Sequence, residues 1–113
     1  MTAFSKILFS GSTNGELIPV TQTATAGDTI HVTGATNLDE IWIWANNTSA
    51  AAVTLTIEWA GTGVANNIVV TLPAYQSDLI IPGLVLMGTK TVAVFASAAN
   101  VVNIFGFVNR ITT

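Results

Sequence analysis

The feature that most constrains the fold is a series of short runs of β-branched and aromatic residues, separated by Gly, Asn, Pro and Ser. In the run VTLTIEW, every second side chain is apolar and those between are polar or charged. This period of two is typical of a strand with one buried and one wet face, and no stretch sustains the period of a helix. The runs expected to form strands are Phe4–Ser10, Leu17–Thr25, Thr29–Thr33, Leu38–Asn46, Val53–Trp59, Asn67–Leu72, Asp78–Ile81, Thr91–Ser97 and Val101–Asn109.

The spacing of these runs predicts a single all-β domain over residues 1–113. A chain of 113 residues has no room for two ordinary domains. About eight to nine short antiparallel strands separated by turns favour a β-sandwich or a jelly roll. The chain has no cysteine, so neither a disulfide framework nor a thiolate metal site can form.

The run DEIWIWANN is apolar on both faces, because Ile41 and Ile43 point one way and Trp42 and Trp44 point the other. Burial of both faces requires a second cover, which is either another layer of the same chain or a neighbouring molecule. The chain has little length left for a third layer and no predicted helix to supply one. We therefore favour a neighbouring molecule, since a bare apolar patch of this size is a liability in solution.

The run VVNIFGFVN repeats this arrangement near the end of the chain. Ile104 and Val108 face one way, whereas Phe105 and Phe107 face the other. Gly106 suits a bulge or the close approach of another backbone. Aromatic residues are enriched at protein contacts, so the expected oligomer interface comprises these two strands. Its residues are Trp42, Trp44, Phe105 and Phe107.

Charged residues make up only 8% of the chain, against about 25% in a typical soluble domain. A neutral, polar surface carries little electrostatic deterrent to association. The only cations are Lys6, Lys90 and Arg110, which do not make the basic patch that nucleic-acid binding needs. Residues 91–109 are uncharged and near the length of a membrane span, but SAAN indicates a turn between two strands. With no visible secretory signal either, we expect neither a nucleic-acid nor a membrane partner.

No catalytic constellation or metal motif is recognisable. His31 is the only histidine and lies among threonines, so we expect an exposed strand residue and not a catalytic base. Glu40 and Glu58 would face each other if their strands paired, but a solvent-facing or interface charge is the better interpretation of each. We therefore predict no catalytic residue, no cofactor and no metal, and a protein that is not an enzyme.

The segments MTAFSKILFSGS, DEIWIWANNTSAAAVTLTIEWAG and GFVNRITT together resemble small virion structural proteins of tailed bacteriophages, and most of all capsid decoration, or cement, proteins. The resemblance implies a jelly roll or small β-sandwich that sits as a trimer on the capsid surface of the virion, after synthesis in the host cytoplasm. Its partner would be the major capsid protein. The run FSKILFS would then supply the capsid contact through Phe4, Ile7 and Phe9. The sequence lacks the long polar N-terminal arm of some decoration proteins, which speaks against binding through such an arm.

The predicted function is thus that of a non-enzymatic homo-oligomer, expected as a trimer, which binds at capsid-subunit junctions and stabilises the shell. One alternative is a tail, head–tail joining or fibre-associated virion protein. Another is a carbohydrate-binding β-sandwich in which Trp42, Trp44 and Tyr75 stack against sugar rings.

Overall fold

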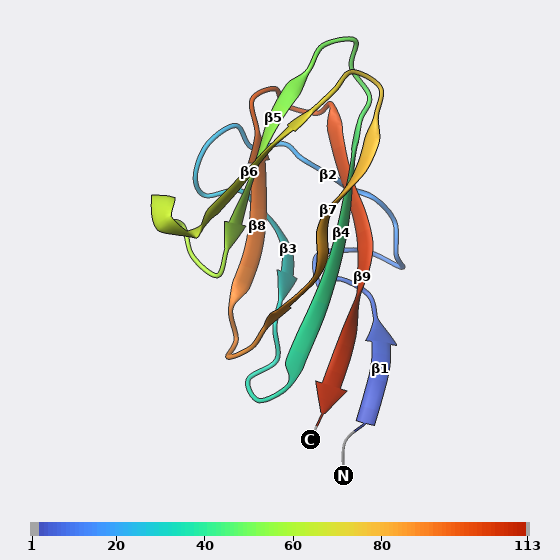
Figure 1. Ribbon diagram of the computed structural model, residues 1–113, viewed down its shortest axis with the longest axis vertical. Helices are drawn as coiled ribbons and strands as arrows, with labels where there is room; N and C mark the ends of the chain where they lie inside the picture. The colour runs from blue at the N-terminus through green and yellow to red at the C-terminus, as the bar shows by residue number, and fades with distance from the viewer. Residues whose placement is uncertain (1–2, 113) are drawn as a thin grey trace.

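The computed structural model describes residues 3–112, which form two antiparallel β-sheets (Figure 1). Apolar side chains fill the space between the sheets, which confirms the predicted all-β sandwich. A short 3-10 turn, η1 (Val64–Asn66), precedes the sixth strand. In chain order the strands are β1 (Ala3–Ile7), β2 (Ile18–Pro19), β3 (Asp28–Val32), β4 (Leu38–Asn47), β5 (Val53–Trp59), β6 (Asn67–Leu72), β7 (Ser77–Leu86), β8 (Thr91–Ala96) and β9 (Val102–Thr112).

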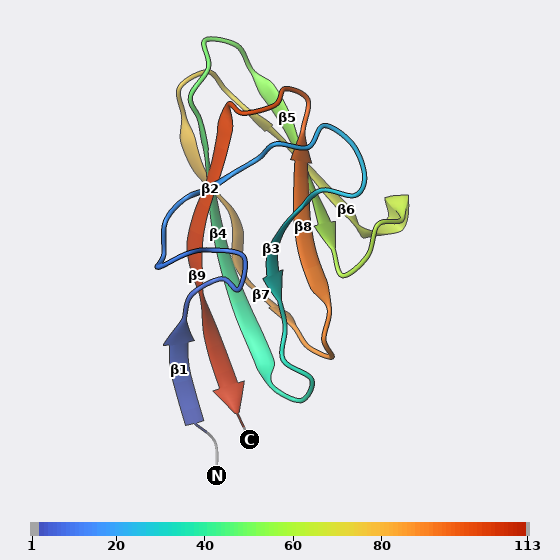
Figure 2. The same cartoon turned by 180° about the vertical axis from the view of Figure 1, so that it is seen from behind.

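The strands pair as a folded ribbon. β5 pairs with β6, β4 with β7, β3 with β8 and β1 with β9. These pairs are nested in the sequence, with β5–β6 innermost and β1–β9 outermost. Rolling of this ribbon joins β4 to β9 and β5 to β8. Sheet A therefore has the order β1-β9-β4-β7, with β2 also paired to β9, and sheet B has the order β3-β8-β5-β6. This double-sheet arrangement is that of a jelly roll. Seen from behind, β1 lies beside β9 at one edge of sheet A (Figure 2).

Two predicted strands differ most from the observed ones, while the strand expected over Phe4–Ser10 ends at Ile7 and that expected to end at Asn109 runs to Thr112. The run expected to be a strand over Leu17–Thr25 pairs only at Ile18–Pro19, because the Asp28 carboxylate accepts the backbone N–H groups of Thr21 and Gln22 and turns the chain. In contrast, the strand expected to end at Ile81 continues through Pro82 to Leu86. Two register shifts against β4 accommodate the proline, which an edge strand tolerates.

The uncharged stretch 91–109 contains β8, a turn and most of β9, as predicted. Among the residues that the structure describes, no helix has the length and apolar character needed to cross a membrane.

The core consists of the inward faces of strands from both sheets. Ile41 and Ile43 of β4, and Leu55 and Ile57 of β5, are completely buried. These positions follow the alternation of the sequence, so the pleat of each strand decides which side chains enter the core.

Candidate contact surface on sheet A

Four aromatic side chains meet on the outer face of sheet A and are termed here the aromatic cluster: Trp42, Trp44, Phe105 and Phe107. Trp42 of β4 lies directly opposite Phe107 of β9, and Trp44 lies opposite Phe105. All four are only partly buried. The structure thus brings together the four residues that the sequence singled out, and no further layer of residues 3–112 covers them completely.

The rings that lie directly opposite each other on β4 and β9 are nearly parallel. The ring centres of Trp42 and Phe107 are 6.1 Å apart, and those of Trp44 and Phe105 are 6.0 Å apart. Beyond Phe107, the Lys6 ammonium lies 4.5 Å from the centre of the ring. On the other side, a Cβ atom at Gly83 of β7 would be only 2.9 Å from the indole of Trp42. A row of contacts therefore crosses β1, β9, β4 and β7.

Gly106 makes this packing possible. Its φ of 151° is unfavourable for other residues, and a Cβ atom there would overlap the carbonyl oxygen of Trp42. The backbones of β4 and β9 therefore approach closely beneath the cluster. Of the two alternatives predicted at this glycine, a bulge or the close approach of another backbone, the structure shows the close approach.

Two shallow hollows flank the cluster. One, of about 380 Å³, adjoins Trp44 and Phe105 and is also lined by Gly15 and Leu17. The other, of about 300 Å³, lies toward β1. Its lining mixes apolar and polar groups: Phe4, Ser5, Lys6, Glu40, Asn109 and Ile111. The aromatic cluster and the two hollows form the surface termed here the aromatic face.

Glu40 is an anion within the aromatic face. Its Oε1 atom accepts hydrogen bonds from the side-chain amide of Asn109, at 3.0 Å, and from the indole N–H of Trp42, at 2.7 Å. These two hydrogen bonds lower the pKa of the Glu40 carboxyl, so it is ionised at neutral pH.

Glu58 does not meet Glu40, because their strands belong to different sheets. The expectation that Glu58 faces solvent or an interface is also wrong, since it is 1% exposed. Its carboxylate accepts the hydroxyl of Thr25 and the backbone N–H of Gly27, each at 2.7 Å. Glu58 therefore fastens the segment 21–27 onto sheet B.

His31 is 1% exposed, so the expectation of an exposed strand residue is wrong. The register of β3 shifts between Thr29 and His31, and both Ile30 and His31 are consequently buried. The His31 Nε2 atom lies 2.8 Å from Asp39 Oδ2, and the His31 Nδ1 atom accepts a hydrogen bond from the backbone N–H of Ser10 at 3.1 Å. Because Nδ1 is an acceptor, the hydrogen is on Nε2 and is donated to Asp39.

Asp39 links the two sheets. It is completely buried and accepts two hydrogen bonds from Arg110, both of 2.8 Å, in addition to that from His31. Burial raises the pKa of the Asp39 carboxyl, but the hydrogen bonds from Arg110 and His31 outweigh it, and the pKa lies below its ordinary value. The Ser10 hydroxyl accepts the N–H of Val32 and does not contact the imidazole, so no nucleophile–base pair is assembled here.

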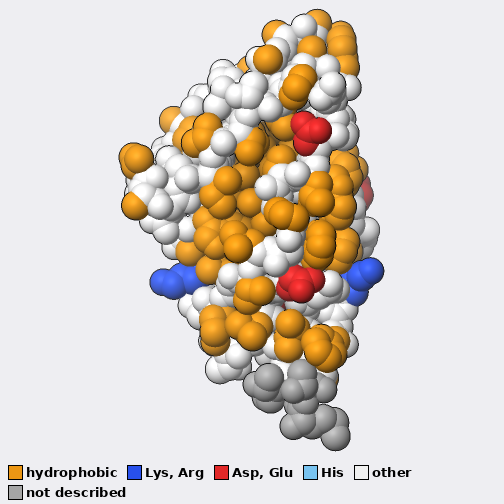
Figure 3. Space-filling model, viewed as in Figure 1, with side chains coloured by type: hydrophobic (Ala, Val, Ile, Leu, Met, Phe, Trp, Pro, Cys, Tyr) orange, Lys and Arg blue, Asp and Glu red, His pale blue; other side chains and the backbone are white. Residues whose placement is uncertain are grey.

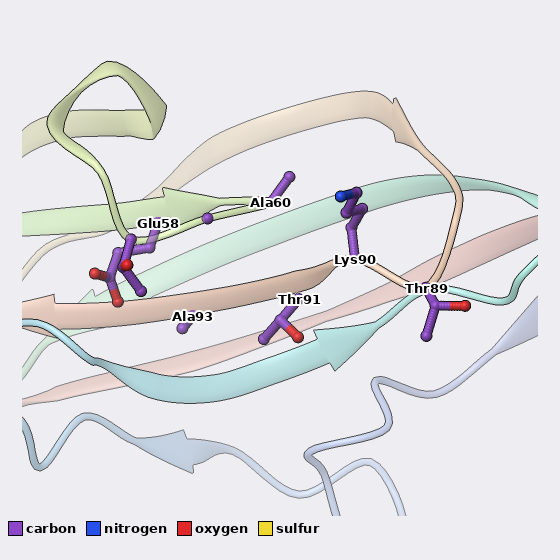
Figure 4. Close-up of a pocket in the computed structure, with 8 residues that line it drawn as sticks. Glu58, Ala60, Thr89, Lys90, Thr91 and Ala93 are labelled. Carbon is purple, nitrogen blue, oxygen red and sulfur yellow. The ribbon is translucent and has the colours of Figure 1, made fainter.

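A third hollow, of about 300 Å³, lies on sheet B and is lined by Glu58, Lys90 and Thr91 among others. Figure 4 shows Lys90 and Glu58 at opposite ends of this hollow. Since the Glu58 carboxylate is already engaged by Thr25 and Gly27, the hollow presents no acid–base pair to a substrate.

Of the three residues expected to contact a capsid, Phe4 is exposed and Ile7 is half-buried on β1. The expectation that Phe9 contacts a capsid is wrong, because Phe9 is 3% exposed and belongs to the core. The segment after β1 turns inward, where Gly11 donates its N–H to the carbonyl of Ile30.

No family model, no curated protein and no solved structure matches the chain. Its function is therefore inferred from the surfaces and contacts described above.

Proposed function

We propose that this protein is a non-enzymatic structural component of a bacteriophage virion, which assembles with copies of itself through the aromatic face and binds the capsid at subunit junctions. The observation that supports assembly is the partly exposed aromatic cluster on the outer face of sheet A, whereas the virion role rests on the resemblance of the sequence segments to phage structural proteins. Two tryptophans and two phenylalanines lie at the centre of one face; both residue types are enriched in protein interfaces, and tryptophan is among those that dominate their binding energy.

The aromatic face is large enough for a stable contact. β4 has 10 residues and four strands lie side by side, so the ordinary spacings of a sheet give a face of up to about 600 Å². In a cyclic trimer this face packs against a different surface of the neighbouring copy. Counting both partners, each contact would bury up to about 1,200 Å², more than the roughly 1,000 Å² expected of a specific interface.

Charge places little obstacle in the way of this contact. The aromatic face carries one cation and one anion, Lys6 and Glu40, and both line the same hollow. From the side of β6 and β7, hydrophobic side chains cover much of the visible surface and charged groups are few (Figure 3). Leu79 and Val85 of β7 are 43% and 45% exposed and extend the apolar surface to the edge of sheet A. Such a surface suits contacts between proteins.

Sugar binding is less well supported by the same cluster. A pyranose ring stacks on an open aromatic face, whereas Phe107 lies between Lys6 and Trp42, and Trp42 lies against Gly83. Tyr75 is exposed, but it lies in the turn before β7, beyond the end of the cluster.

The capsid contact is proposed for β1, at the edge of sheet A next to the aromatic face. Phe4 is 74% exposed there and Ile7 lies half-buried beside it. An exposed edge strand with an apolar side chain offers both a backbone edge and a side chain to a partner. In solution these groups are available without any rearrangement of the sandwich.

The first test is the mass of the purified protein by light scattering at neutral pH and moderate salt. A trimer, three times the chain mass of 11.8 kDa, is expected, and a monomer would overturn the assembly part of the proposal. Trp44→Ala should then weaken the oligomer, since the loss of a central aromatic anchor costs about 2 kcal/mol or more of binding free energy.

The second test is co-sedimentation with empty shells of tailed-phage major capsid proteins. Saturable binding that Phe4→Ser weakens is expected, with the oligomer mass unchanged. An oligomer that never pellets with any shell, or that pellets equally well with Phe4→Ser, would contradict the capsid contact.

A further inference from the structure

The two sides of the sandwich, where the edges of the sheets meet, differ in how the chain closes the core. On one side, the segment between β1 and β3 lies across the gap and buries Phe9, Ile18 and Val20. On the other side, β6 and β7 are the outermost strands of their sheets, and they diverge from the turn that joins them (Figure 1). No strand within residues 3–112 pairs with the free edge of either, so this side of the core has no cover of its own.

Four apolar side chains at this second side occupy core positions but remain partly exposed. They define the surface termed here the open side: Ile68 and Val70 of β6, and Leu84 and Leu86 of β7. Their partners on the neighbouring strands β5 and β4 are all completely buried: Ile57, Leu55, Ile41 and Asp39. The pleat therefore directs the four side chains toward the core, yet Leu84 is still 44% exposed.

The open side matches the aromatic face in size and is nearly free of charge. β7 has 10 residues, and the spacing of packed sheets and the width of their edge strands give the open side an area of up to about 500 Å². Hydrophobic side chains cover much of the surface seen from this side (Figure 3). Asp78 is the single charged residue of β6 and β7, so charge sets little barrier to an apolar contact here.

The position of the open side suits a closed assembly. A trimer built through the aromatic face needs a second, different surface on each copy. The outer face of sheet B carries exposed threonines, such as Thr54 and Thr71, and points away from sheet A. Contacts between opposite sides of a protein stack the copies into an open filament, whereas contacts between adjacent sides turn each copy and allow a ring to close. The open side adjoins the aromatic face along β7, where Leu79 and Val85 continue the apolar surface.

We propose that the open side receives the aromatic face of a second copy of this chain, so that head-to-tail contacts close into a ring. The aromatic cluster of one copy then covers the partly exposed core positions of the next. β7 lies between the two surfaces and therefore lines the symmetry axis. This inference rests on the proposed assembly and names the surface that completes it.

Complementation between two variants tests the pairing. Trp44→Ala damages the aromatic face, and Leu84→Asp places a carboxylate in the open side. Each variant alone should self-associate about tenfold or more weakly than the wild type, because one loses an aromatic anchor and the other buries an unpaired charge. An equimolar mixture should still form a two-chain complex, since the first variant keeps its open side and the second keeps its aromatic face. Light scattering should then give twice the chain mass of 11.8 kDa.

Matched variants separate this contact from a general loss of folding. Thr71→Asp places the same charge on the exposed outer face of sheet B and should keep the wild-type mass. Leu84→Ser repeats the test without a buried charge, and urea unfolding checks that each variant is folded. An oligomer unchanged in both Leu84 variants, or a mixture that does not associate, would overturn the open side as the partner surface while the assembly stands. A monomeric wild type would overturn the assembly and this contact together.

Discussion

The outer faces of the two sheets differ in how far the chain itself covers them. Over sheet B, the chain folds its own segment 21–27 against the strands (Figure 1), and Glu58, which binds this segment, is 1% exposed. Over sheet A, the described chain adds no such segment across Trp42 and Trp44, which remain partly exposed. The chain thus covers part of the more polar face itself and leaves the aromatic cluster partly exposed, although solubility alone would favour covering the apolar face.

The composition of the two faces sharpens this contrast. Thr54, Thr71 and Thr29 point outward from sheet B and are exposed, as expected of strands in contact with water. The corresponding positions of β4 and β9 carry the aromatic cluster. Substitutions that affect sheet B should therefore change folding, whereas substitutions in the aromatic cluster should change assembly.

The largest effect on folding is expected on the inner side of β4, where Asp39 joins the sheets. Asp39→Asn should lower the free energy of unfolding by about 3 kcal/mol, near the lower end for a buried ion pair because Arg110 is 26% exposed. Since the pKa of Asp39 is lowered in the folded protein, its contribution is present above about pH 4 and is lost as pH falls through the folded value. Urea unfolding from pH 7 to pH 2.5 should show the gap between wild type and variant narrowing below pH 4. A constant gap would contradict the ionised assignment.

A somewhat smaller loss of folding stability is expected when the cover of sheet B is unfastened. Glu58→Ala removes the acceptor of two hydrogen bonds and should cost about 2 kcal/mol, measured by urea unfolding. Glu58→Gln, which retains one acceptor oxygen, should lose less. The oligomer mass should stay that of the wild type in both variants, and a change in mass would mean that sheet B also takes part in assembly.

The fold was largely predictable from the sequence because it depends on alternation. The period of two in β5 and the two-faced pattern of β4 follow directly from the pleat of a strand. Asp39 also carried a signal, since it shares the register of the buried Ile41 and Ile43. The burial of His31 could not be predicted, because a register shift in β3 turns this side chain inward. No pattern of residue types in the sequence indicates such a shift.

The burial of charged residues was the other feature that the sequence did not predict. Glu58 stands in the polar register of β5 and became buried only because the segment 21–27, distant in the sequence, folds over it. Arg110 meets Asp39 through the pairing of β9 with β4, which is decided by the topology of the whole sandwich. The aromatic cluster was easier to predict, since both of its strands show it locally as a second apolar face.

Two phenylalanines, one on each outer face, test whether sheet A and not sheet B mediates self-association. Phe105 and Phe95 are both half-buried on outer faces, one on sheet A and the other on sheet B. Phe105→Ala should weaken self-association by about 1–2 kcal/mol, as for a residue near the centre of an interface, whereas Phe95→Ala should leave it unchanged. Sedimentation equilibrium over a concentration series measures both. Equal weakening by the two variants would show that the aromatic face has no special part in assembly.

The smallest effect is expected at Lys6, at the margin of the aromatic face. Its ammonium lies 4.5 Å from the centre of the Phe107 ring, a contact that contributes about 0.5–1 kcal/mol when partly exposed. Lys6→Ala removes the cation and the aliphatic stem, Lys6→Met removes only the cation, and Lys6→Arg keeps both features. If the cation matters, Met should weaken self-association nearly as much as Ala, and Arg should restore it. If Met restores it fully, the stem alone covers Phe107, and the aromatic face is closed at this edge by apolar packing.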